Sequence, residues 1–101
     1  MAPFSEELAQ CTGFRWDPGN AEKIWRLYRV SQAECEQIFF NRPLRVAPDQ
    51  KHSRQEPRWA ALNQTNAGRL LSIVFTVRGT HVRVISARDM SRNERRLYEQ
   101  T

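Results

Sequence analysis

Apolar residues recur with helical spacing early in the chain. The spacing i, i+3, i+4, i+7 places four of them on one face of a helix: Ala21, Ile24, Trp25 and Tyr28. Asp17 precedes Pro18 as an N-cap precedes a proline at the first helical position, where the missing N–H is not needed. The pattern predicts a helix that begins at residue 17 and buries this four-residue face.

A second helix is expected directly after the first. Ser31 and Glu34 have the spacing of a capping box, in which each side chain bonds the backbone N–H of the other residue. Val30 and Cys35 occupy the positions of a hydrophobic staple around this cap. The apolar pattern continues to Phe39 and ends at the Asn41-Arg42-Pro43 segment, so we expect a helical hairpin over residues 17–41.

From residue 44 the pattern changes to strand-like runs separated by turn residues. Residues 14–16 alternate like a short strand, and four further runs fit strands at 44–46, 58–62, 69–77 and 82–87. Short connections between consecutive runs favour an antiparallel meander. Ser91 and Glu94 then form a second capping-box pair, which opens a C-terminal helix.

These elements predict the order β-α-α-β-β-β-β-α. We therefore expect an α+β fold, with an antiparallel β-sheet, an N-terminal helical hairpin and a C-terminal helix. The chain of 101 residues is long enough for one core, so residues 14–101 are predicted to be a single domain and residues 1–13 an N-terminal extension.

Positive charge is concentrated in the second part of the chain. Residues 1–41 hold four basic and six acidic residues, a balance of −2, whereas residues 42–101 hold twelve basic and five acidic residues, a balance of +7. Only Lys23 and Lys51 among the sixteen basic residues are lysine. Because the arginine fork suits bidentate contact with phosphate or carboxylate, this half predicts a phosphate-rich or acidic partner. The alternative is a solvated basic surface.

Several classes of protein are disfavoured by the sequence. The longest mostly apolar run, residues 70–75, is far shorter than the roughly 20 residues that a membrane span needs. The first eight residues carry Glu6 and Glu7 and lack a signal-peptide pattern, so a cytoplasmic location is expected. Cys11 and Cys35 are widely spaced, and neither a disulfide nor a metal site is predicted; no cofactor is expected.

Three stretches along the chain resemble one known family. Phe14-Arg15-Trp16-Asp17-Pro18 leads into the first helix, and His52-Ser53-Arg54-Gln55-Glu56-Pro57-Arg58 leads into a strand. The third stretch is Arg83-Val84-Ile85-Ser86-Ala87-Arg88, followed by Glu94-Arg95-Arg96-Leu97-Tyr98-Glu99. Together they span about residues 14–99 and resemble the BrnT family of ribonuclease toxins in type II toxin–antitoxin systems.

The resemblance implies a RelE-like fold and metal-independent cleavage of RNA. It also implies neutralisation by a BrnA-type antitoxin, a ribbon-helix-helix protein, so that DNA is contacted only through this partner. No membrane is implied. The leading interpretation is therefore an endoribonuclease toxin, and the alternative is a non-catalytic or attenuated module that binds an antitoxin or nucleic acid through the same fold.

The chain departs from the family pattern in two places. Family members usually carry Lys-His-Gly-Val at the end of the first helix, preceded by an asparagine and a lysine, where this chain has Leu27-Tyr28-Arg29-Val30, with Asn20 and Ile24 before it. Asn63 stands where a glycine is expected after the strand at 58–62. The loss of the Lys-His pair favours the alternative interpretation.

Metal-free RNA cleavage needs an activated 2′-hydroxyl, a stabilised phosphorane and a protonated leaving oxygen. We expect three arginines to hold the scissile phosphate, Arg58, Arg83 and Arg88, and proton transfer to fall to Glu56, His52 or Tyr98. On a regular strand, Arg83, Ile85 and Ala87 share one face. Further RNA contacts are predicted for five arginines: Arg29, Arg69, Arg78, Arg92 and Arg95.

Each of the proton-transfer candidates also has a structural interpretation. Glu56 can form a salt bridge with Arg58 on one strand face. Tyr98 can pack the terminal helix against the sheet, and His52 can be a solvated residue of a polar loop.

Overall fold

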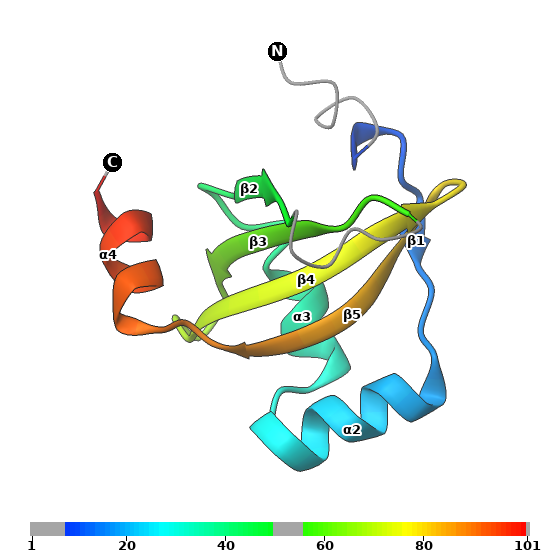
Figure 1. Cartoon of the computed structure of the whole chain (residues 1–101), viewed down its shortest axis with the longest axis horizontal. Coiled ribbons are helices and arrows are strands. Elements are labelled where there is room, and N and C mark those ends of the chain that lie inside the picture. The colour runs from blue at the N-terminus through cyan, green and yellow to red at the C-terminus, as the bar shows by residue number, and fades with distance from the viewer. Residues whose placement is uncertain (1–7, 50–55, 101) are drawn as a thin grey trace.

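The computed structural model describes residues 8–49 and 56–100 (Figure 1). The elements follow the predicted order: β1 (Gly13–Phe14), α2 (Pro18–Tyr28), α3 (Gln32–Gln37), β2 (Arg45–Pro48), β3 (Trp59–Gln64), β4 (Leu70–Arg78), β5 (His81–Asp89) and α4 (Arg92–Glu99). Residues 1–7 of the predicted extension lie outside the described residues. No helix in the described part of the chain has the length and apolarity to cross a membrane.

The five strands form one mixed sheet in the order β1-β5-β4-β3-β2. The pairs β2–β3, β3–β4 and β4–β5 are antiparallel, as the short connections predict. The prediction of a wholly antiparallel sheet is wrong, because β1 pairs with β5 in parallel at the edge. Most of the chain lies between these two strands, so no hairpin fixes their relative direction.

Both predicted capping boxes are confirmed. The Ser31 Oγ accepts from the Glu34 N–H at 3.1 Å, and the Glu34 carboxylate accepts from the Ser31 N–H at 2.9 Å. Ser91 and Glu94 make the same two bonds at the start of α4, at 3.2 and 2.8 Å. The spacing of these side chains is sufficient to fix both helix starts, since the bonds are local.

Helix α2 begins as predicted but buries less than its pattern suggests. The Asp17 carboxylate accepts from the Gly19 N–H at 2.8 Å, which confirms the N-cap. Of the four residues predicted to be buried, only Ile24 is, while Trp25 and Tyr28 are 48% and 44% exposed. The helix lies beside β5, the strand next to the edge strand β1, and this narrow contact covers one row of side chains rather than a broad face (Figure 1).

One face of the sheet carries the core. Helix α3 lies against this face, and its Cys35 and Ile38 are fully buried (Figure 1). The Phe39 and Phe75 rings meet edge to face with centroids 5.0 Å apart. Burial raises the pKa of the Cys35 thiol to about 12, so this cysteine stays protonated and packs as a small apolar group, as predicted. The buried cluster comprises Ile24, Val30, Cys35, Ile38, Ala61, Leu71, Ile73, Phe75, Val82, Val84 and Ala87.

Candidate functional site

A bulge in β5 decides which arginines share a face of the sheet. Val74 is opposite Ser86 and Phe75 is opposite Val84, so Ile85 is an extra residue without a partner across the pair. Arg83 and Arg88 are an odd number of residues apart and would lie on opposite faces of a regular strand. The bulge brings them to the same face, opposite the core. It also moves Ala87 to the core face, so the prediction that Arg83, Ile85 and Ala87 share one face is wrong.

We call this side of the sheet, opposite α3, the open face. The strand register arranges its residues in rows that run across the strands. One row joins Arg45, Leu62, Ser72 and Arg88. A second row joins Thr76 and Arg83 nearer the other end, with Arg58 just before β3 on the same face by alternation. Four residues of β4 separate the two rows, which is about 13 Å along a strand.

The row at Arg83 contains the first cluster of predicted site residues. Glu56 accepts a hydrogen bond from Arg78 at 2.9 Å. This bond, with the positive charges of Arg78, Arg83 and Arg58, lowers the pKa of the Glu56 carboxyl. Arg83 lies 3.8 Å from the Asp17 carboxylate and is 23% exposed in its side chain. The structure therefore brings together four residues that the sequence predicted to act on RNA: Glu56, Arg58, Arg78 and Arg83.

Arg88 lies in the other row and binds a different carboxylate, that of Glu94. Its Nη1 and Nη2 donate to the two Glu94 carboxylate oxygens at 2.7 and 3.0 Å, a bidentate pair between sheet and α4. Ser72 donates to the same carboxylate at 3.1 Å. Burial alone would raise the pKa of Glu94, but the hydrogen bonds from Arg88 and the Ser91 N–H outweigh it and lower this pKa to about 2. Arg88 and Arg83 are thus held at separate anions, and the prediction that one phosphate contacts both is revised.

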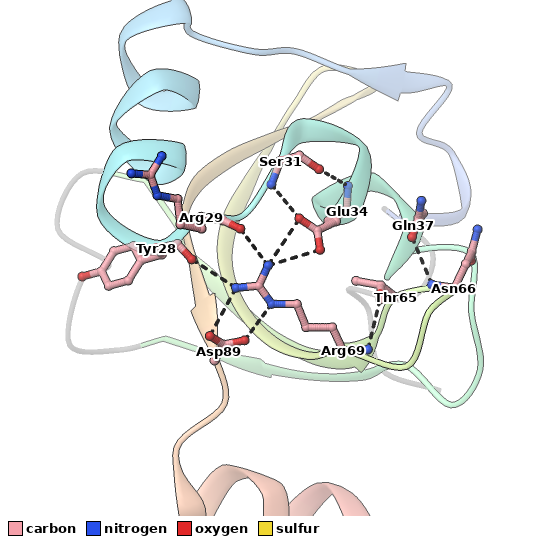
Figure 2. A network of polar contacts seen from close by, with 9 residues as sticks. All are labelled: Tyr28, Arg29, Ser31, Glu34, Gln37, Thr65, Asn66, Arg69 and Asp89. Atoms are coloured by element: carbon pink, nitrogen blue, oxygen red, sulfur yellow. Dashed lines mark hydrogen bonds and ion pairs between the residues drawn. The ribbon is translucent and has the colours of Figure 1, made fainter.

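Arg69 is placed inside the fold rather than at an open surface. Figure 2 shows its guanidinium group between the end of α2, the start of α3 and the end of β5. It donates to the carbonyl oxygens of Tyr28 and Arg29 at 3.1 and 2.7 Å, to Glu34 at 3.2 Å and to Asp89 at 2.8 Å. Because each guanidinium nitrogen already donates within the chain, Arg69 is not available to a phosphate, and the RNA contact predicted for it is not supported.

Tyr98 is buried, and its hydroxyl donates to the Asn63 side chain at 2.7 Å. The Asn63 amide in turn donates to the carbonyl oxygens of Ile38 and Asn41, at 2.8 and 2.6 Å. Tyr98 therefore packs α4 onto the sheet and reaches no open surface with its hydroxyl. This confirms the interpretation that Tyr98 packs the terminal helix against the sheet, and it removes Tyr98 from the proton-transfer candidates.

The remaining predicted residues lie at other positions. His52 lies outside the described residues. Arg29 stacks on Trp25, with its guanidinium carbon 5.4 Å from the ring centroid, at the exposed end of α2. Arg92 and Arg95 are exposed on α4 and line a shallow hollow together with Arg96 and Glu99. The helix thus presents a basic stripe to its surroundings.

Three functional residues were not predicted from the sequence. Ser72 and Arg45 lie in the row with Arg88, and the Nε of Arg45 is buried without a hydrogen-bond partner among the described residues. Ser72 is the polar interruption of the apolar run 70–75, which is a usable signal. Glu94 was recognised only as a cap, because its contacts with Arg88 and Ser72 depend on where α4 docks.

The described residues contain no group of three or more histidine, cysteine, aspartate or glutamate side chains that could hold a metal ion. The chemistry available on the open face is that of arginine, carboxylate and hydroxyl groups. Such a face can bind the phosphates of a polyanion and orient a carboxylate beside them. The fold and this face define a small α+β protein whose open face is rich in arginine.

Comparison with known proteins identifies the family. The model of the ribonuclease toxin BrnT of type II toxin–antitoxin systems matches residues 16–94, and the chain belongs to this family. The 1.1 Å crystal structure of the Brucella abortus ribonuclease toxin BrnT has a similar fold. The TM-score is 0.62 at 19% identity, over 80% of this chain and 99% of that one. A comparison with curated proteins found no significant match.

Proposed function

We propose that the protein is a toxin that cleaves cellular RNA without a metal ion, and that the row at Arg83 is its catalytic centre. One observation carries this proposal: Glu56 and Arg58 lie just before β3 and Arg83 lies on β5, and these two segments meet at one end of the open face. Surface arginines placed at random would not surround a single carboxylate in this way. Family membership supports the proposal, since the family consists of ribonuclease toxins.

In the proposed reaction, Arg83 and Arg58 bind the scissile phosphate and stabilise the charge of the phosphorane. Arginine suits this role because it stays protonated and presents a planar fork to the phosphate oxygens. Glu56, whose lowered pKa keeps it ionised at neutral pH, accepts the proton of the 2′-hydroxyl or orients Arg78 against the strand. His52 remains the candidate for protonating the leaving oxygen.

The proposed partner is a BrnA-type antitoxin with a ribbon-helix-helix DNA-binding domain, and the proposed location is the cytoplasm. The family belongs to type II systems, in which the toxin has a protein antitoxin. The basic stripe of α4, which contains Arg92 and Arg95, is available to such a partner or to the RNA backbone. DNA contact is proposed only through the antitoxin.

A second candidate is an attenuated member that binds its partner without cleaving RNA. It is favoured by Leu27 and Tyr28, which replace the usual Lys-His pair of the family. Both residues are exposed, at 53% and 44%, so they are not core replacements of a lost polar pair. Neither side chain supplies the positive charge that the lysine of this pair carries.

Cleavage of a labelled single-stranded RNA in EDTA separates the two candidates. We expect cleavage by the wild type and loss of at least a hundredfold in rate for Arg83→Ala, because a clamping charge typically contributes 10²–10³. Arg26→Ala, on the exposed side of α2, removes the same charge away from the open face and should cleave like the wild type. Unchanged cleavage by a folded Arg83→Ala would refute this centre, and no cleavage by the wild type would favour the attenuated module.

Expression of the protein in cells tests the partner. We expect growth arrest by the toxin alone and relief when a short neighbouring gene that encodes a ribbon-helix-helix protein is expressed with it. Arrest that depends on Arg83 would connect growth to the proposed centre. Arrest without relief by that gene would contradict the proposed antitoxin.

A further inference from the structure

The row at Arg88 contains two hydrogen-bond donors that converge on one anion. Arg88 and Ser72 are direct partners across β4 and β5, so their side chains stand next to each other on the open face. The Arg88 fork and the Ser72 hydroxyl donate to the same carboxylate, that of Glu94. A third bond, from Arg88 Nη1 to the Asp89 carbonyl oxygen at 3.1 Å, fixes the guanidinium orientation.

Among the described residues, these donors have one further acceptor, the Asp89 carbonyl oxygen, which binds Arg88. Ser72 is 6% exposed, and its hydroxyl has no hydrogen bond in the described part of the chain except that to Glu94. A bidentate fork with an adjacent hydroxyl is also the arrangement that binds a phosphate, whose oxygens can replace those of a carboxylate. The site is therefore built for an anion, and an internal carboxylate now fills it.

The helix that supplies this carboxylate is weakly attached. Of the residues of α4, only Tyr98 is buried, and Leu97 is 63% exposed. An isolated helix of this length is not stable in water, so α4 depends on its contacts with the sheet. Those contacts lie at two points: Glu94 binds Ser72 and Arg88, and the Tyr98 hydroxyl donates to the Asn63 side chain at 2.7 Å.

We propose that Arg88 and Ser72 form a second phosphate-binding site on the open face, and that the Glu94 carboxylate of α4 occupies it until a phosphate of the RNA strand takes its place. This inference rests on the proposed function and adds to it a position for another phosphate of the same strand and a competitor for that position.

Binding of an RNA strand that cannot be cleaved tests the competitor directly. The probe is a labelled single-stranded 2′-O-methyl oligonucleotide, followed by fluorescence anisotropy at fixed salt. We expect Glu94→Gln to bind it roughly tenfold more tightly than the wild type, as expected for removal of a bidentate competitor. Glu22→Gln, on the exposed side of α2, makes the same change in net charge and should alter affinity less than about twofold at physiological salt.

A double variant assigns the gain to Arg88. In Glu94→Gln/Arg88→Ala the tighter binding should be lost, because the phosphate no longer has its fork. Equal gains for Glu94→Gln and Glu22→Gln would overturn the proposal, since they would show an effect of net charge alone. So would a gain that survives the loss of Arg88.

A measurement on the wild type covers the case in which Glu94→Gln does not fold. Hydrogen exchange of the α4 amides should become faster when the oligonucleotide binds, because the phosphate displaces the contact that holds the helix. Unchanged or slower exchange in α4 would refute the displacement. Because these readouts use an uncleavable strand, they stand apart from the cleavage assay: a protein that binds as predicted but never cleaves would refute the ribonuclease function and leave this site in place.

Discussion

Replacement of Arg69 by methionine tests whether this arginine holds the two helices and β5 together. Methionine keeps an unbranched apolar chain but removes every guanidinium donor. The bonds to the Tyr28 and Arg29 carbonyl oxygens contribute about 1 kcal/mol each. The pair with Glu34, in which both side chains are 28% exposed, contributes roughly 1 kcal/mol, and the pair with Asp89, whose side chain is 65% exposed, less than about 0.5 kcal/mol.

The expected loss is therefore about 3 kcal/mol in the free energy of unfolding, or roughly 12–24 °C in melting temperature for a domain of this size. Urea unfolding followed by tryptophan fluorescence measures it, with unchanged m-values as the sign that the unfolded state is the same. Arg92→Met is the matched control. Its side chain is exposed on α4, so its loss should stay within about 0.5 kcal/mol.

The Arg69 variant also has a signature in its pH dependence. Burial would raise the pKa of Glu34, but bonds from the Ser31 N–H and Arg69 lower it, and the Arg69 bond lowers the pKa of Asp89. A carboxyl with a lowered pKa stabilises the fold above its ordinary pKa and loses this contribution as the pH falls. The difference between wild type and Arg69→Met should thus shrink below about pH 4. A loss below 1 kcal/mol at pH 7, or a difference that does not change with pH, would refute this reasoning.

Three further predictions concern single residues of the fold. Arg29 has a φ of 55°, so Arg29→Gly should raise the free energy of unfolding by about 0.5–1 kcal/mol in urea titrations; a decrease would contradict the strain. The pKa of Glu94 is lowered to about 2, so its contribution to the stability of the fold is present above about pH 4.3 and lost towards pH 2. The melting temperature of Glu94→Gln should therefore fall less than that of the wild type as the pH is lowered over this range. Asn63→Ala should cost about 3 kcal/mol, since it leaves the Tyr98 hydroxyl and two carbonyl oxygens unpaired, whereas Tyr98→Phe should cost about 1 kcal/mol; equal losses in thermal melts would contradict the network.

The local signals in the sequence were reliable where the physics is local. The start of α2 at Asp17 and the caps at Ser31 and Ser91 formed as their spacing predicts, because each bond joins residues two or three apart. The order of elements and the meander followed from strand patterns and short connections for the same reason. The exposure of Trp25 and Tyr28 could not be predicted from the helical pattern, because it depends on how much of α2 the sheet covers.

The candidate site was only partly visible before the fold was known. The sequence singled out Glu56, Arg58 and Arg83, which do lie together, because their family motif and basic character mark them without any knowledge of contacts. The packing of Tyr98 against the sheet was one of two interpretations of the sequence, whereas the internal hydrogen bonds of Arg69 could not be predicted. An arginine that binds carbonyl oxygens of its own chain and one that binds phosphate look the same in a sequence.

The sequence by itself determined the helix starts, the order of elements along the chain and the concentration of arginine in its second part, since these depend on neighbouring residues and composition. The tertiary structure alone decided the parallel pairing of β1, the bulge at Ile85 and the docking of Glu94 on Arg88. Each of these joins segments that are distant in the chain or shifts a register by one residue. A one-residue shift exchanges the two faces of a strand, and here it places Arg83 and Arg88 on the same open face.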